Sequence, residues 1–264
     1  MGLPAVLRSR QAVRVRRGLT IPVLLLIVWE ALSRTGLVDA RFLPSLEDVF
    51  FTAKHQLIDN DLIGEVGVSL FRNVAGFLIG SFIGIAFATL LALSRMADAL
   101  ITPTFNGLKQ ISLLAWIPLI SIWFGFGEQA KVVFVAIAAF IPVVLNTYEG
   151  MRNTPRDLIE VGRALQFTPL QRIRRIFLPA ALPSIATGVH LGLIYSWLAT
   201  VGAEYFLAVG RGVGGLIIAG REHFDMALVM VGVFILGLVG FALNRLAAAA
   251  ESYLLRWRVN RQAE

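Results

Sequence analysis

Long apolar runs separated by short polar segments restrict what this chain can fold into. A helix crosses a bilayer core of about 30 Å with roughly 20 mostly apolar residues. About six such runs are present, at residues 19–32, 68–94, 103–124, 130–146, 184–201 and 226–248. Only 16% of the residues are charged, against about 25% in a typical soluble domain. The sequence therefore predicts an all-α membrane protein with about six transmembrane helices.

The first run is the least regular of these spans. It is short, contains Pro22, and follows a basic lead made of Arg8, Arg10, Arg14, Arg16 and Arg17. The same pattern is typical of a secretory signal peptide, although residues 31–33 match a cleavage site only loosely. We favour a retained helix over a cleaved signal. Residues 1–18 are then a basic N-terminal segment, and residues 19–34 are the first transmembrane helix.

The positions of the positive charges predict the orientation of the spans. Arginines gather in the N-terminal lead, at Arg95, across residues 152–175 and in the last residues of the chain. All of these segments lie on one side if about six spans are present, and Lys and Arg near span ends stay in the cytoplasm. Both termini are therefore expected to be cytoplasmic, with residues 35–67 as an extracytoplasmic loop, 68–250 as the core and 251–264 as a cytoplasmic tail. The formal charge of +7 follows from this topology, which weakens a nucleic-acid interpretation.

Small residues recur at intervals of four in two of the runs. The positions are Gly76, Gly80 and Gly84 in the second run, and Ser184, Gly188, Gly192 and Ser196 in the fifth. This spacing places them on one face of a helix, where a neighbouring helix can approach closely. We therefore expect a tightly packed bundle. Pro118 and Pro142 are expected to kink the third and fourth spans.

The charged segment at residues 154–183 interrupts the apolar pattern with a predicted pair of short helices. Thr154-Pro155-Arg156-Asp157 resembles a helix start with a capping threonine, a proline in the first turn and an acid three residues after the cap. Leu158, Val161 and Leu165 then share one side of the helix. This helix is expected to stop near residues 166–167.

A second helix start follows at Thr168-Pro169-Leu170-Gln171. Pro179 and Pro183 are expected to end this second helix and to begin the fifth span. Three roles fit such a pair: a surface connector held by anionic lipid, a DNA-binding helix-turn-helix, or a docking knob for a cytoplasmic protein. Attachment to the membrane at both ends disfavours the DNA-binding role.

The stretch EVGRALQFTPLQRIRRIFLP resembles the EAA loop of ABC importer permeases. Glu160 holds the acidic position of that motif, and Ile176, Leu178 and Pro179 stand at the spacing of its end. Val161 and Gly162 replace its two alanines. Gln166 replaces its glycine, the residue that best tolerates a left-handed turn. The match predicts a cytoplasmic coupling segment at residues 154–178.

Three further stretches are similar to the nitrate/sulfonate/taurine branch of these permeases. They are Trp29-Glu30, LPS at residues 43–45, and WIPLISIWFGFGE at residues 116–128. The resemblance implies a type I (MetI-like) permease bundle in a bacterial inner membrane, working as a homodimer. It also implies two ATPase subunits and an extracytoplasmic solute-binding protein as partners. In that family the EAA helices insert into a cleft on each ATPase subunit.

The resemblance assigns ATPase coupling to one set of residues in this loop. They are Leu158, Glu160, Val161, Arg163, Ala164, Leu165, Gln166 and Phe167. The chain has no G-x-x-x-x-G-K-[ST] loop, so ATP and magnesium are expected on the partner ATPase, and we predict no catalytic residue and no bound cofactor here. Residues 210–215, GRGVGG, are interpreted as a flexible external turn. Cysteine is absent and the histidines are scattered, so no metal site is predicted.

The solute path is less visible, because few ionisable residues lie inside the spans. Lys109, Asn146, His190 and Tyr195 are its weak candidates. We favour two plainer interpretations, namely that Lys109 extends to the cytoplasmic face and that His190 is hydrogen-bonded within the bundle. Glu204 either borders an outer gate or marks the membrane interface.

These observations predict the permease subunit of an ATP-driven importer that moves a small anion, such as a sulfonate, taurine or nitrate, by alternating access. The anion class comes from the resemblance alone. One alternative is a secondary transporter driven by an ion gradient, which would need buried acidic residues within its spans. The apolar centres of the spans show almost none. The other alternative is a membrane-anchored helix-turn-helix regulator.

Overall fold

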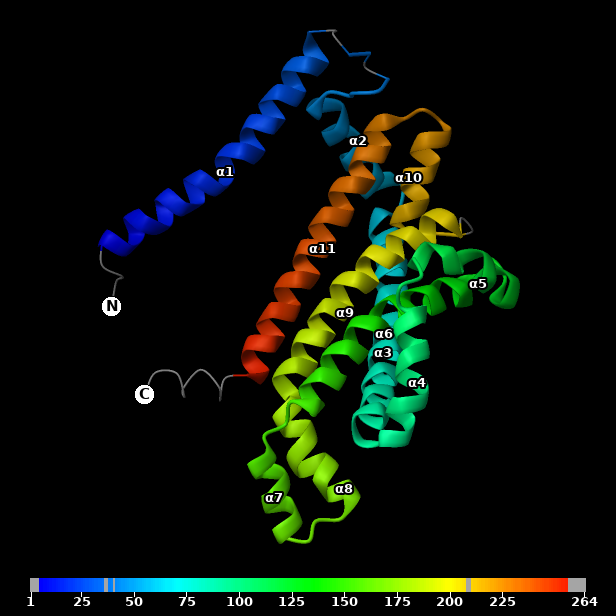
Figure 1. Cartoon of the computed structure of the whole chain (residues 1–264). Helices are drawn as coiled ribbons and strands as arrows, with labels where there is room; N and C mark the ends of the chain where they lie inside the picture. The colour runs from blue at the N-terminus through cyan, green and yellow to red at the C-terminus, as the bar shows by residue number, and fades with distance from the viewer. Residues whose placement is uncertain (1–4, 36–37, 40, 208–209, 256–264) are drawn as a thin grey trace. The chain divides into compact units, whose positions relative to one another are not determined.

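The computed structural model describes residues 5–35, 38–39, 41–207 and 210–255, and the regular elements in these ranges are all helices (Figure 1). The chain forms two compact units, Met1–Leu62 with Leu216–Val233, and Ile63–Gly215 with Phe234–Glu264. The first unit contains α1 (Ala5–Arg34) and α2 (Leu46–Asp59). Two helices, α10 (Val213–Glu222) and α11 (Met226–Leu254), run from one unit into the other.

The second unit contains seven further helices in its described residues. They are α3 (Leu62–Leu93), α4 (Arg95–Leu108), α5 (Ile117–Phe124), α6 (Glu128–Arg152), α7 (Arg156–Ala164), α8 (Pro169–Arg172) and α9 (Leu178–Phe206). A 3-10 turn (Leu113–Trp116) precedes α5, and a π-helical turn (Ile173–Phe177) joins α8 to α9.

In the first unit, two of the stretches quoted from the sequence contact each other. The indole Nε1 of Trp29 donates a 2.8 Å hydrogen bond to the carbonyl of Pro44. The carboxylate of Glu30 accepts the backbone N–H of Leu46 at 3.0 Å. Ser45 caps α2 in a reciprocal box with Asp48. The Trp-Glu pair of α1 therefore holds the start of α2.

Among the residues that the structure describes, four helices are long and apolar enough to cross a membrane: Leu62–Leu93, Glu128–Arg152, Pro169–Phe206 and Met226–Leu254. A fifth span is possible if Arg95–Leu108 and Leu113–Phe124, which meet at 97°, count together. The third span predicted at residues 103–124 is therefore divided between two helices, and the kink expected at Pro118 lies elsewhere. The bend lies at residues 109–112, and Pro118 sits in the first turn of α5 beyond it. Helix α1 covers the first predicted run but is not among these candidates.

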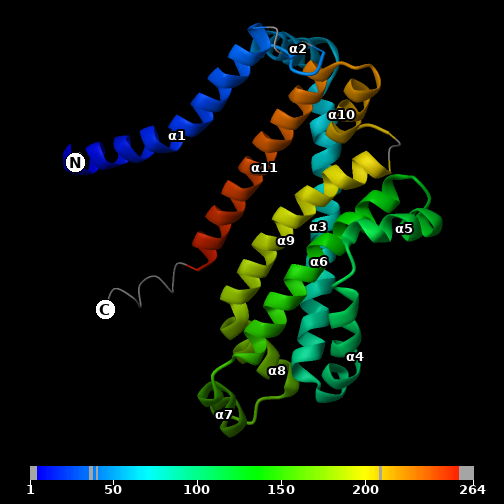
Figure 2. The ribbon, with the colours of Figure 1, turned by 45° about the horizontal axis from the view of Figure 1, so that its top comes forward.

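Close packing of α3 and α9 on α6 confirms the small-residue faces expected from the sequence, and Figure 2 shows these three helices next to one another. A Cβ added at Gly80 of α3 would lie 2.2 Å from the carbonyl oxygen of Ala136. On the other side, a Cβ at Gly188 of α9 would lie 2.7 Å from the Cβ of Asn146. Helix α6 is thus held between two faces where only small side chains fit, which is how van der Waals packing stabilises helices in lipid. Pro142 is buried within α6, which continues as one helix to Arg152; the kink predicted there stays a prediction.

Candidate functional site: the α7–α8 helix pair

The helix pair α7 and α8 lies beyond the ends of α6 and α9, in agreement with the predicted segment at residues 154–178 (Figure 1). The first helix begins one residue later than expected. Its N-cap is Pro155, which provides no side-chain hydrogen bond. Thr154 is buried, and its hydroxyl has no hydrogen-bond partner in the described part of the chain. The predicted threonine cap is therefore wrong, because this side chain turns into the protein instead of toward the helix start.

The turn between the two helices has the left-handed residue that the motif predicts. Gln166 has φ +51°, although a side chain makes that conformation costly. The N–H of Gln166 bonds to the carbonyl of Arg163 at 2.9 Å, and that of Phe167 bonds to Gly162 at 3.0 Å. These two bonds define a Schellman cap, the usual way of ending a helix with a left-handed residue. The turn expected for glycine thus forms with glutamine.

The second helix starts as predicted but does not end as predicted. Thr168 accepts the N–H of Gln171, and the Gln171 side chain accepts the N–H of Thr168, so the capping box is present. Helix α8 then continues through the π-helical turn into α9, and residues 169–206 form one helix of 38 residues. Pro179 and Pro183 lie within this helix. Both prolines are internal to this continuous helix, and helical neighbours can compensate in a membrane span for the backbone hydrogen bonds that prolines remove.

The helix pair shows an apolar face to its surroundings. Leu158, Val161 and Leu165 are 45%, 54% and 60% exposed. Glu160, Arg163, Ala164 and Gln166 are also exposed around them. This cluster, termed the α7 face, brings together most of the residues predicted for coupling. Phe167 is half-buried, with the guanidinium of Arg175 over its ring at 5.4 Å.

The opposite side of α7 packs onto the start of the long helix. A Cβ added at Gly162 would lie 2.2 Å from Cδ1 of Ile176, and Ile176 is buried. Leu178 and Pro179 follow directly as the first residues of α9. The motif end therefore attaches α7 to the helix that runs through the bundle.

The four candidates for the solute path are not brought together. Lys109 lines a cavity of about 510 Å³ between α4 and α6, together with Asn106 and Arg152. The Asn146 amide donates to the carbonyl of Pro142, one turn earlier in its own helix, at 2.8 Å. Tyr195 is largely exposed. Of the four, only Lys109 lines this cavity.

His190 is hydrogen-bonded within the bundle, as the plainer interpretation expects. Its Nδ1 lies 2.7 Å from Glu251 Oε2, and its Nε2 lies 2.8 Å from Asn244 Oδ1. Both partners belong to α11. The histidine therefore ties α9 to α11, with both ring nitrogens engaged. In the part of the chain that the structure describes, no group of three or more His, Cys, Asp or Glu side chains could hold a metal ion.

A buried charge cluster at the far end of the bundle was missed by the sequence analysis. Arg72 of α3 and Glu204 of α9 are only 2% and 3% exposed. Nη1 of Arg72 lies 2.7 Å from Glu204 Oε1, and Nη2 lies 2.6 Å from Glu128 Oε1. Buried Lys131 also approaches Glu128, at 3.5 Å. Both acids lie outside the predicted apolar runs at residues 130–146 and 184–201, Glu128 at the start of α6 and Glu204 near the end of α9. The available signal was a charge within an apolar run, Arg72 in the second span.

The glycine-rich stretch at residues 210–215 is not the free turn that was expected. Gly210 and Gly212 have positive φ angles. The N–H of Val213 donates to Ser69 Oγ at 3.0 Å, and that of Gly214 donates to Glu204 Oε2 at 2.8 Å. The N–H of Gly212 bonds to Glu65. Three consecutive N–H groups at the start of α10 are thus capped by side chains of α3 and α9.

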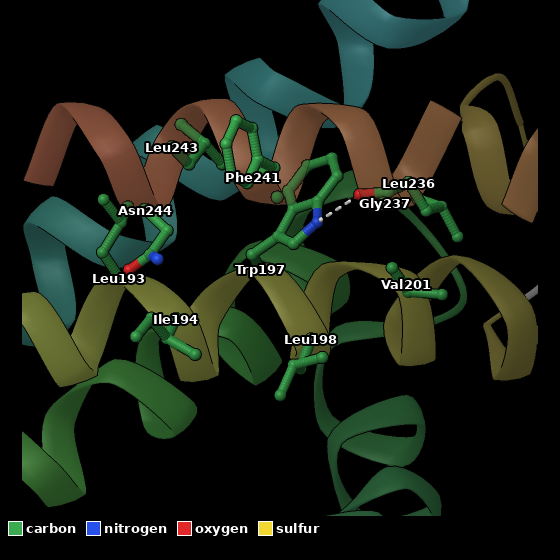
Figure 3. Close-up of a pocket in the computed structure, with 11 residues that line it drawn as sticks. Leu193, Ile194, Trp197, Leu198, Val201, Leu236, Gly237, Phe241, Leu243 and Asn244 are labelled. Atoms are coloured by element: carbon green, nitrogen blue, oxygen red, sulfur yellow. Dashed lines mark hydrogen bonds between the residues drawn. The ribbon is translucent and has the colours of Figure 1, made fainter. Parts of the chain in front are cut away.

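A second cavity is almost entirely apolar. Figure 3 shows the groove between α9 and α11, in which Trp197 Nε1 donates to the carbonyl of Leu236 at 3.1 Å. The groove measures about 550 Å³, and Asn244 is its one polar side chain among residues that are otherwise aliphatic, aromatic or glycine. An anion placed there would lose its hydration without gaining charge-assisted bonds. This groove is therefore a poor path for a charged solute.

Comparison with known proteins identifies the family. Residues 76–257 match the model of the binding-protein-dependent transport system inner membrane component. The chain is 34% identical over 92% of its length to the putative aliphatic sulfonates transport permease protein SsuC of Bacillus subtilis, covering 87% of that protein. It is 31% identical over 88% of its length to the bicarbonate transport system permease protein CmpB of Synechococcus elongatus, covering 86% of that protein.

Two solved structures share the fold. One is the MetNI methionine ABC transporter in inward-facing conformations, with TM-score 0.57 and 22% identity over 71% of this chain and 95% of that one. The other is an amino acid ABC transporter, with TM-score 0.59 and 17% identity over 78% of this chain and 98% of that one. The expected MetI-like bundle and the sulfonate-related branch are both confirmed. The chain belongs to the binding-protein-dependent transport system inner membrane components, the permease subunits of ABC transporters.

Proposed function

We propose that this permease imports a small anion and is driven through the α7 face by a separate ATPase. The observation that carries the proposal is the exposed apolar face of α7, attached by Ile176 to one continuous helix through the bundle. A short helix with bare leucine and valine side chains and a charged rim fits a groove on another protein. Motion of that partner would move α7 and, through the attachment, the long helix.

The remaining partners follow from the family. The permease works as a homodimer with two ATPase subunits, which bind ATP and magnesium, and an extracytoplasmic protein delivers the solute. Both termini and the α7–α8 pair lie in the cytoplasm of a bacterial inner membrane, which the arginine-rich segments support. ATP binding and hydrolysis shift the bundle between inward-open and outward-open states. Membership in this permease family favours such a mechanism over a gradient-driven transporter or a DNA-binding regulator.

The solute is a small anion of the sulfonate, taurine or nitrate type. Two relatives are named for aliphatic sulfonates and bicarbonate, both anions. Lys109 supplies a cation in the cavity between α4 and α6, beside the helix break at residues 109–112. Lys109→Met should therefore raise the solute concentration needed for half-maximal transport, and Lys109→Arg should restore it. Equal transport curves for all three proteins would remove Lys109 from the path.

The coupling role is tested by placing charge on the α7 face. Val161→Glu with Leu165→Glu should abolish co-purification of the ATPase and solute-stimulated ATP hydrolysis, because the carboxylates would be desolvated against the partner. The permease itself should still fold, since both side chains are exposed. Phe42→Glu, at an exposed phenylalanine outside α7, is the matched control and should leave ATPase binding intact. Normal ATP hydrolysis in the double variant would refute the coupling role.

A further inference from the structure

We infer that Ser69, Arg72, Glu204 and Gly214 form a latch that makes α3 and the start of α10 follow the movements of the α7–α9 helix. The inference rests on the proposed coupling function. It concerns the opposite end of the bundle, where no role has been assigned. These four residues are positioning residues, because none of them is placed on the solute.

The latch is centred on one buried carboxylate. Glu204 Oε1 accepts hydrogen bonds from Arg72 Nη1 and from Ser69 Oγ, both at 2.7 Å. Its Oε2 accepts the backbone N–H of Gly214 at 2.8 Å. One side chain of α9 thus binds α3 twice and α10 once. Hydrogen bonds to a carboxylate in a dry setting are strong and directional, so these parts resist separation.

The fit around the carboxylate is close at Gly214. A Cβ added at Gly214 would lie 2.5 Å from the Cβ of Glu204, which is too short for any side chain. At the neighbouring Gly215, an added Cβ would meet only the carbonyl oxygen of Gly210, at 3.4 Å. Only the first of these two adjacent glycines is therefore needed for the approach of α10 to α9.

The same helix connects the latch to the α7 face. Gly162 of α7 packs on Ile176, near one end of the 38-residue helix at residues 169–206. Glu204 lies two residues before its other end. At 1.5 Å per residue, the helix carries a displacement over about 40 Å from Ile176 to Glu204. A movement imposed on α7 would therefore displace Glu204, and the three charge-assisted hydrogen bonds of Glu204 would displace α3 and α10 with it.

Arg72 also connects the latch to the surface. Its Nη2 binds Glu128 at 2.6 Å, and the Glu128 side chain is 59% exposed at the start of α6. Water already solvates the Glu128 carboxylate. Removing the Glu128 charge would therefore leave Arg72 paired with Glu204. Glu128 is therefore not required for the latch. A substitution of Glu128 thus tests the exposed Arg72–Glu128 pair apart from the buried Arg72–Glu204 pair.

The test uses the two adjacent glycines in the assembled complex of permease, ATPase and solute-binding protein. The readout is the ratio of ATP hydrolysis with solute-loaded binding protein to hydrolysis without it. Gly214→Ala should lower this ratio about tenfold, the factor expected from losing one charge-assisted hydrogen bond in the moving state. ATPase co-purification should remain normal. Gly215→Ala should keep the wild-type ratio.

A second variant covers the possibility that Gly214→Ala does not assemble. Arg72→Met with Glu204→Gln removes both buried charges together, which proteins often tolerate, and it should also lose stimulation while keeping the ATPase bound. Glu128→Gln is its control and should stay coupled. A wild-type ratio in either Gly214→Ala or the double variant would overturn the latch. The latch would also be overturned if Gly215→Ala lost as much coupling as Gly214→Ala. The same holds if Glu128→Gln lost as much coupling as the double variant. Failure of the proposed function would differ, because the α7-face variants would then leave ATPase binding unchanged.

Discussion

The two ends of the long helix at residues 169–206 use charge and apolar surface in opposite ways. At the α7 end, leucine and valine side chains are exposed and the charged groups surround them. At the Glu204 end, the charges are buried and pair with one another. The first arrangement is incomplete alone and suits a partner, whereas the second is satisfied within the chain. The difference implies that substitutions at the α7 end should impair assembly, and substitutions at the Glu204 end should impair folding or transmission.

The largest stability effect is expected at Arg72. Arg72→Ala would leave Glu204 buried without its cation, and an uncompensated buried charge costs about 3–5 kcal/mol. Thermal unfolding of the purified permease in detergent measures this loss. Glu128→Gln should cost less than about 1 kcal/mol, because exposed ion pairs contribute little. Similar losses for both variants would contradict the contrast between buried and exposed charge at this end.

At the α7 end, two threonines that each precede a proline should differ. Thr168→Ala removes a capping box and should lower the free energy of unfolding by about 1 kcal/mol. Thr154→Val should be neutral or slightly stabilising, because the buried hydroxyl of Thr154 has no partner among the described residues. Chemical denaturation of the two variants under one condition compares them. A larger loss at Thr154 would show that its hydroxyl caps α7 after all.

The smallest effect is expected in the turn of the helix pair. Gln166→Gly should stabilise the protein by up to about 1 kcal/mol, because glycine adopts φ +51° without steric cost. Arg163→Gly, inside α7, should act in the opposite direction by about 1 kcal/mol through its lower helix propensity. Shifts in the unfolding temperature of the same sign for both variants would count against the left-handed turn.

Local patterns in the sequence predict the α7 end well. The spacing of Leu158, Val161 and Leu165 indicates an amphipathic helix, and Thr168 with Gln171 signals the next helix start. The small-residue faces of α3 and α9 are predictable for the same reason, since each depends on one helical period. Thr154 shows the limit of such patterns, because its hydroxyl points into the protein, and its neighbours there are known only from the fold.

The Glu204 end depends on contacts between distant parts of the chain. Arg72 and Glu204 are 132 residues apart, and no local pattern pairs them. The bend at residues 109–112 was expected at Pro118 instead, because the apolar run at residues 103–124 continues on both sides of the break. A sequence can show that a charge lies within a span, but its partner appears only when the helices are packed.

The central claim is that the α7 face touches the ATPase. The chain contains no cysteine, so Val161→Cys introduces a single reactive site on the exposed face of α7. In the assembled complex, a short thiol-directed cross-linker should join this cysteine to the ATPase subunit, whereas Phe42→Cys should give no such product. The account would be contradicted if the Val161→Cys permease gave no cross-link to the ATPase although a small maleimide still labelled its cysteine.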